Sequence, residues 1–152
     1  MKSKAVVTAL LLVFVAAGLG WIGVRVSRKP SAPVAATATA PVVAYYFHGR
    51  VRCVSCNKIE ALSKKVIGLA FAPDLKTGRL AQVEVDVDQP GNEHFVKEYA
   101  LTGSAVVLVD GRAGAGGRWK NLESVWTLLD DEAAFSKYIR DNVSEFLAGG
   151  AK

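Results

Sequence analysis

The stretch of sequence that decides the fold is residues 42–56, which read VVAYYFHGRVRCVSC. Its first six residues are aliphatic or aromatic without interruption, which is typical of a strand buried on both faces of a sheet. Gly49 then provides a sharp exit from this strand. A helix is expected over residues 53–67, because apolar residues recur there and just beyond with helical spacing, at Ile59, Leu62, Val66 and Leu69.

The two cysteines of the chain, Cys53 and Cys56, stand three positions apart where this helix begins. In the first helical turn, residues at i and i+3 lie on one face, so the two sulfur atoms are close enough to form a disulfide. The unpaired N–H groups and partial positive charge at a helix amino terminus favour a thiolate, and the neighbouring Arg52 adds positive charge. We therefore predict a redox-active Cys53–Cys56 disulfide, with no other cofactor, in which Cys53 is the nucleophile and Cys56 the resolving thiol.

Downstream of this motif the chain continues to alternate strands and helices. We expect strands over residues 80–87 and 105–109, a short helix over 91–101, a hairpin strand around 118–120 and a closing helix over 132–147. The side chains expected to face the core are Leu80, Val83, Val85, Val87, Phe95, Val96, Tyr99, Phe135, Tyr138, Ile139, Val143 and Phe146. The order β-α-β-α-β-β-α predicts a three-layer α/β sandwich with parallel first strands and chemistry at their carboxyl ends.

His48 ends the first predicted strand and allows two interpretations. It is either a proton acceptor or metal ligand beside the thiols, or a loop histidine bound to the backbone. The alternative function is therefore a binding module, in which Cys53, Cys56 and His48 hold a soft ion such as Cu(I), zinc or trivalent arsenic. A third alternative is a structural domain that keeps an inert disulfide. A four-cysteine zinc site is excluded, because the sequence has no second pair of cysteines.

Acidic and tryptophan side chains elsewhere are further candidates. The second predicted strand carries acidic residues at alternate positions, namely Glu84, Asp86 and Asp88. They allow a proton relay or a cation site, but the interpretation we favour is a solvated face of the strand. Trp119 and Trp126 can line a substrate groove, although apolar neighbours favour core packing for Trp126. None of these residues is needed for the dithiol chemistry predicted above.

The composition and motifs of the chain exclude several classes of function. Of its 19 basic residues five precede residue 42, and none of its 14 acidic residues does, so residues 42–152 carry no net charge. A nucleic-acid partner is therefore not expected, since it requires a basic face on the folded domain. The sequence also has no G-x-G-x-x-G motif that would indicate a flavin or nicotinamide site. A reductase function must then draw its electrons from a partner by dithiol exchange.

Residues 1–29 are expected to form a membrane anchor. Ala5 to Val24 is an uncharged run of 20 residues, and a helix of that length spans about 30 Å, the thickness of a hydrocarbon core. A cleaved signal peptide is the alternative, although its apolar region is usually shorter. The Ala-, Pro- and Thr-rich residues 30–41 form a linker, residues 42–148 the folded domain, and residues 149–152 a frayed tail. We expect a single-pass protein of a bacterial inner membrane, with the domain on the periplasmic side and a membrane electron donor as its partner.

The predicted elements and the CxxC motif together resemble the thioredoxin-like fold over residues 42–148. This resemblance implies a thiol–disulfide oxidoreductase that acts on protein thiols or disulfides, with Cys53 as nucleophile and Cys56 as resolving thiol. A longer string resembles a small bacterial thioredoxin-like family labelled as a nitrophenyl compound nitroreductase subunit, associated with organoarsenical resistance operons and a partner membrane protein. The residues that carry this narrower resemblance are Tyr46-Phe47-His48-Gly49, Arg52-Cys53, Cys56 and Ile59-Glu60.

The chain departs from the thioredoxin pattern at three places. Arg52 replaces the tryptophan before the first cysteine, and Val54-Ser55 replaces the Gly-Pro between the cysteines. Ser104 occupies the position of the cis-proline that faces the disulfide in thioredoxins, and we expect a trans bond there because a cis bond without proline costs several kcal/mol. Together with His48, Arg52 and Ser104 are therefore the predicted supporting residues of the site.

Overall fold

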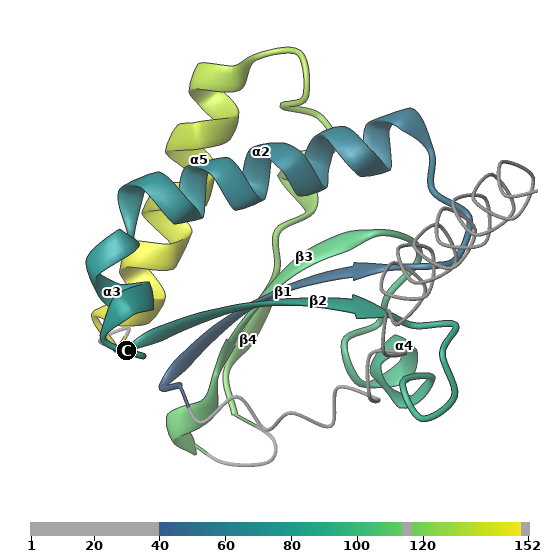
Figure 1. Ribbon diagram of the computed structural model, residues 1–152, viewed down its shortest axis with the longest axis horizontal. Coiled ribbons are helices and arrows are strands. Elements are labelled where there is room, and N and C mark those ends of the chain that lie inside the picture. Colours follow the sequence, from purple (N-terminus) through teal and green to yellow (C-terminus); the bar gives the residue numbers. More distant parts are fainter. Residues whose placement is uncertain (1–39, 114–116, 150–152) are drawn as a thin grey trace, which may run out of the picture. The chain divides into compact units, whose positions relative to one another are not determined.

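The computed structural model describes residues 40–113 and 117–149, and Figure 1 shows how their helices and strands are arranged. The elements in chain order are β1 (Val42–His48), α2 (Val54–Ala70), α3 (Ala72–Lys76), β2 (Leu80–Asp86), α4 (His94–Glu98), β3 (Ala105–Asp110), a 3₁₀ turn (Gly111–Ala113), β4 (Trp119–Asn121), a second 3₁₀ turn (Glu123–Val125) and α5 (Glu132–Leu147). The predicted order of strands and helices is confirmed, with the short helix α3 added after α2.

The predicted anchor over residues 1–29 lies outside the described residues. So do all but the last two residues of the predicted linker, and residues 150–152 of the tail. In the part of the chain that the structure describes, no helix is long and apolar enough to cross a membrane.

The four strands form one mixed sheet in the order β2-β1-β3-β4. β1 pairs in parallel with β2, from Val42 opposite Leu80 to His48 opposite Asp86, which confirms the predicted parallel β-α-β unit. β3 runs antiparallel to β1, and β4 antiparallel to β3. β1 is thus a central strand, and all of its residues are buried, as its uninterrupted apolar sequence predicted.

Helices cover both faces of the sheet, which confirms the three layers. In Figure 1 α2 and α5 lie over one face and α4 lies under the other. The core between the sheet and α2 and α5 includes Tyr46, Ile59, Leu108, Phe135, Ile139 and Phe146. The core between the sheet and α4 includes Tyr45, Phe47, Val85, Phe95, Tyr99 and Val107. The architecture of this part of the chain is therefore the thioredoxin-like one.

Helix α2 is longer than predicted and buries a slightly different stripe. Its buried residues are Cys56, Ile59, Ser63, Val66 and Ile67. Leu69, expected to face the core, is 75% exposed, because the sequence offers Ile67 to fill the last inward position of the stripe. The helix ends where Phe71 packs into the core, and Pro73, which cannot continue a preceding helix, lies in the first turn of α3.

Outside α2, Val96 and the pair Leu80 and Val83 also differ from the predicted core. Val96 is exposed, because the five-residue helix α4 buries only Phe95 before the chain turns at Tyr99. Leu80 and Val83 face opposite sides of the sheet, as residues three apart in a strand must. Leu80 packs with the α2 core and Val83 with the α4 core.

Candidate redox site

Cys53 and Cys56 form a disulfide at the amino-terminal end of α2, with their Cα atoms 5.0 Å apart. Cys53 is the N-cap of the helix, and its Sγ accepts a hydrogen bond of 3.0 Å from the backbone N–H of Cys56. Cys53 is exposed, whereas Cys56 is only 7% exposed. A thiolate from a partner can therefore reach the sulfur of Cys53 more easily than that of Cys56, which is the arrangement that the predicted roles require.

The helix terminus gives this disulfide an electropositive setting. The first turn of α2 contains no acidic residue, and the first backbone N–H groups of a helix lack intrahelical partners. These groups and the helix dipole stabilise negative charge at the N-cap position. After reduction, a thiolate on Cys53 would lie at that position, so the geometry favours its ionised form.

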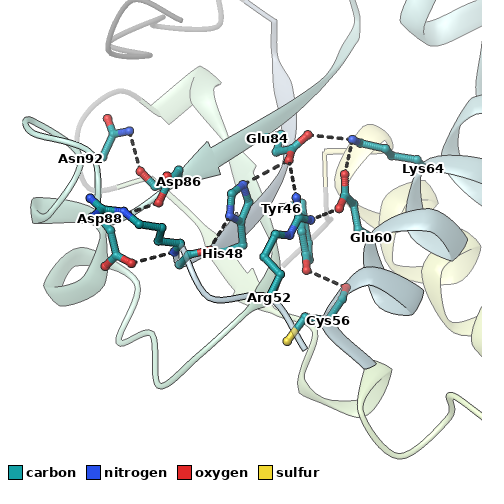
Figure 2. A network of polar contacts seen from close by, with 12 residues as sticks. Tyr46, His48, Arg52, Cys56, Glu60, Lys64, Glu84, Asp86, Asp88 and Asn92 are labelled. Carbon is teal, nitrogen blue, oxygen red and sulfur yellow. Dashed lines mark hydrogen bonds and ion pairs between the residues drawn. The ribbon is translucent and has the colours of Figure 1, made fainter. Parts of the chain in front are cut away.

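Arg52, which precedes the disulfide, is directed toward carboxylates rather than toward solvent. Its Nη2 contacts Glu60 Oε2 on α2, and its Nη1 lies 3.2 Å from Glu84 Oε1 on β2. Figure 2 shows the guanidinium between these two carboxylates. The guanidinium also lies over the ring of Tyr46, with 5.7 Å from its central carbon to the ring centroid. The charge of Arg52 is therefore already paired in the oxidised protein.

Glu84 also links Arg52 to Lys64 and His48. Its carboxylate lies 2.8 Å from Lys64 Nζ and 3.1 Å from His48 Nε2, and Lys64 also pairs with Glu60. Burial alone would raise the pKa of Glu84, but the hydrogen bond and charge of Lys64, together with His48 and Arg52, hold it below its usual value. We refer to the connected set as the Arg52 cluster, which consists of Tyr46, His48, Arg52, Glu60, Lys64 and Glu84.

Tyr46 links this cluster to the second cysteine. Its buried hydroxyl donates a hydrogen bond of 2.7 Å to the backbone carbonyl of Cys56, and its ring packs against that of His48. The hydroxyl therefore fixes the first turn of α2 to the central strand β1.

A cleft of about 650 Å³ opens beside Cys56. Its walls are mostly apolar and include Val51, Val96, Leu101, Ser104 and Trp126. Asp88 is the one charged side chain among the described residues that line it. Cys56 is the member of the disulfide that lines this cleft.

Trp126 belongs to this cleft and not to the core, which corrects the interpretation that apolar neighbours favoured. It is 41% exposed, and its indole N–H donates a hydrogen bond of 3.2 Å to the carbonyl of Ser104. Ser104 is buried at the start of β3, and its preceding peptide bond is trans, as expected. Trp119 is half-exposed on the edge strand β4 and packs edge-on against Tyr99.

The structure does not bring His48 to the cysteines as part of a ligand set. One ring nitrogen faces Glu84, and Nδ1 lies 2.9 Å from the carbonyl of Gly49. Within residues 40–113 and 117–149, no group of three or more histidine, cysteine, aspartate or glutamate side chains is arranged to hold a metal ion. The acidic residues of β2 and the turn after it do not form the solvated face that we expected. Glu84 is paired with Lys64, and Asp88 accepts a hydrogen bond from the backbone N–H of Arg50.

Sequence reasoning missed the roles of Tyr46, Glu60 and Glu84. Tyr46 and Glu60 belong to the string of residues that carries the narrower resemblance, and the i, i+4 spacing of Glu60 and Lys64 is a signal from which their pairing can be predicted. Glu84 could be placed beside them only from the register of β1 and β2, which sets Tyr46 opposite Glu84.

Comparisons with known proteins give few matches. No protein-family model and no curated protein match the chain. Among solved structures, a thioredoxin from Thermus thermophilus is 22% identical, with a TM-score of 0.45 over 81% of this chain and 89% of the other. A structure described as a malarial protein is 18% identical, with a TM-score of 0.35 over 47% of this chain and 71% of the other. The thioredoxin-like fold of the described residues follows from their strand order and layers, and Cys53 and Cys56 form the CxxC disulfide at the start of α2.

Proposed function

We propose that this protein is a thiol–disulfide oxidoreductase that passes electron pairs through Cys53 and Cys56. One observation carries the proposal: an exposed N-cap sulfur is bonded to a shielded one, next to an open apolar cleft. Exposed apolar side chains flank the motif, with Val51 91% and Val54 86% exposed. Such a surface suits a protein partner better than a small soluble thiol.

In the reducing direction, the Cys53 thiolate attacks a sulfur of a partner disulfide, and the partner's other sulfur leaves as a thiolate and takes up a proton. The Cys56 thiol then loses its proton and attacks the Cys53 sulfur of the mixed disulfide. This step releases the partner's second thiolate and re-forms the Cys53–Cys56 bond. Two electrons move to the partner, and the protein is oxidised; the reverse sequence oxidises a dithiol.

The proposal extends to where the protein works and what reduces it. The apolar run from Ala5 to Val24 supports a single-pass anchor in a bacterial inner membrane, with the domain on the periplasmic side. A membrane electron donor then re-reduces the disulfide by exchange, since the sequence carries no flavin or nicotinamide motif. In this arrangement the protein serves as an electron-relay subunit, the role that its resemblance to the nitroreductase-subunit string suggests. Retention of the full chain in alkali-washed membranes is the expected result.

Trapping of mixed disulfides tests the exchange chemistry. In the full chain, Cys56→Ser leaves Cys53 able to attack but removes the thiol that resolves the adduct. We expect covalent adducts with partner proteins that disappear on reduction. Cys53→Ser is the matched control and should give none. If Cys56→Ser forms no adducts, or if both variants form them equally, the proposed mechanism is wrong.

A further inference from the structure

Arg52 has the most contacts with charged groups of any residue next to the disulfide. Its guanidinium is held by Glu60 from α2 and by Glu84 from β2, and it lies over Tyr46 from β1. These contacts come from three different elements of the fold. Through one side chain, the residue before Cys53 is therefore fixed to each of them (Figure 2).

The charges around Arg52 balance within the described residues. Arg52 and Lys64 supply two positive charges, and Glu60 and Glu84 supply two negative ones, each carboxylate contacting both cations. A guanidinium that is paired with two carboxylates has little net field at a distance. Its contribution to a thiolate on Cys53 is therefore smaller than the sequence position alone suggests, and its structural contribution is larger.

The second cysteine is fixed to the same strand. The Tyr46 hydroxyl binds the carbonyl of Cys56, while the Tyr46 ring supports the guanidinium of Arg52. β1 is the fully buried central strand, so it is a rigid support for both cysteines. None of these contacts involves a sulfur atom, so opening of the disulfide does not by itself break them.

We propose that Arg52 is a positioning residue for the redox couple: with Glu60, Glu84 and Tyr46 it keeps Cys53 next to Cys56 after reduction and so favours re-formation of the disulfide. The inference rests on the proposed function, in which Cys53 and Cys56 cycle between the two states. Its consequence is thermodynamic. Loss of the Arg52 contacts lowers the effective concentration of one thiol at the other, so the disulfide becomes easier to reduce.

The test is the equilibrium of the full chain with glutathione buffers, read by alkylation of free thiols and mass. The variants are Arg52→Gln, Arg52→Lys and Glu60→Gln. Lysine keeps the charge but lacks the planar fork that contacts two carboxylates at once. We expect all three to lower the equilibrium constant for disulfide formation at least threefold, where a tenfold change corresponds to about 30 mV.

Two further measurements separate position from charge and from folding. The pH dependence of Cys53 alkylation should be the same in Arg52→Lys as in the unmodified chain, and circular dichroism should show that each variant is folded. Lys137→Gln, which breaks the exposed pair with Asp141 on α5, is the matched control and should leave the equilibrium unchanged.

Three results would overturn the inference. If Arg52→Lys keeps the original equilibrium while Arg52→Gln raises the pKa of the Cys53 thiol, Arg52 acts by its charge. If none of the three variants changes the equilibrium, the cluster does not position the cysteines. If the unmodified chain does not exchange with glutathione and Cys56→Ser forms no adducts with partner proteins, the proposed function fails together with the inference.

Discussion

Reduction of the Cys53–Cys56 disulfide should lower the stability of the fold without unfolding it. The bond joins residues only three positions apart, so it closes a loop of residues 53 to 56. In the chain-entropy description, a loop this short contributes about 2 kcal/mol, against about 3 kcal/mol for a loop of 15 residues. For a domain of this size we therefore expect reduction to lower the melting temperature by roughly 8 °C.

The remaining stability does not depend on the bond. The two cores on either side of the sheet are built from side chains such as Phe47, Ile59 and Phe135, which are fully buried and lie in separate elements. The N-cap hydrogen bond from the Cys56 N–H to the Cys53 sulfur can also persist in the thiol form, although sulfur is a weak acceptor. The reduced protein should therefore stay folded and able to exchange.

Urea unfolding of the full chain measures this difference, with the oxidised chain, the reduced chain and Cys53→Ser compared. Serine is a favourable N-cap, and Cys53 is exposed, so this variant should lose the loop closure and little else. Its free energy of unfolding should agree with that of the reduced chain within about 0.5 kcal/mol. A reduced chain that is unfolded without urea, or a difference above about 4 kcal/mol, would mean that the bond is a structural link and would refute the reasoning.

Three other predictions concern the surroundings of the disulfide. Tyr46→Phe removes the buried hydrogen bond to the Cys56 carbonyl and should lower the free energy of unfolding by about 1 kcal/mol in urea titrations; an unchanged value would mean that the hydroxyl does not fix the helix. Because the pKa of Glu84 is held below its usual 4.5, the stability that its ionised form contributes should be present at pH 7 and lost as the pH falls below that value. The stability difference between the unmodified chain and Glu84→Gln should therefore shrink on acidification, and a constant difference would contradict the pairing. Trp126→Ala should reduce adduct formation by Cys56→Ser several-fold, whereas Trp126→Phe, which keeps an aromatic surface in the cleft, should reduce it less; equal adduct yields in all three would show that partners do not use this wall.

The fold was predictable because its main signals are local. An uninterrupted apolar run predicted the central strand β1, helical spacing predicted α2, and the order strand-helix-strand predicted the parallel pairing of β1 with β2. The disulfide was predictable for the same reason, since a spacing of three at a helix start brings two sulfur atoms together. Helical periodicity wrongly predicted burial of Leu69. Both Ile67 and Leu69 are apolar, and the structure buries Ile67 at the last inward position of the helix.

The surroundings of the disulfide were less predictable, because they depend on residues distant in sequence. Arg52 reaches Glu84 across 32 positions, and only the pairing of β1 with β2 brings them together. Trp126 reaches Ser104 across 22 positions, through the turn that follows β4. Its apolar neighbours suggested burial, but the 3₁₀ turn at Glu123–Val125 buries Val125 and leaves the indole at the cleft.

The residues of the cleft and those of the Arg52 cluster should affect different properties of the redox site. Val51 and Arg52 are consecutive, yet Val51 lines the cleft while Arg52 joins the ion pairs with Glu60 and Glu84. Cys56 and Gly49 both line the cleft and contact the Arg52 cluster, Cys56 through its carbonyl and Tyr46, and Gly49 through its carbonyl and His48. Changes in the cluster should therefore act on the equilibrium between dithiol and disulfide, and changes in the cleft on the choice of partner. A redox protein with this layout can change its partner by substitutions in the cleft while the contacts that hold its cysteines together stay intact.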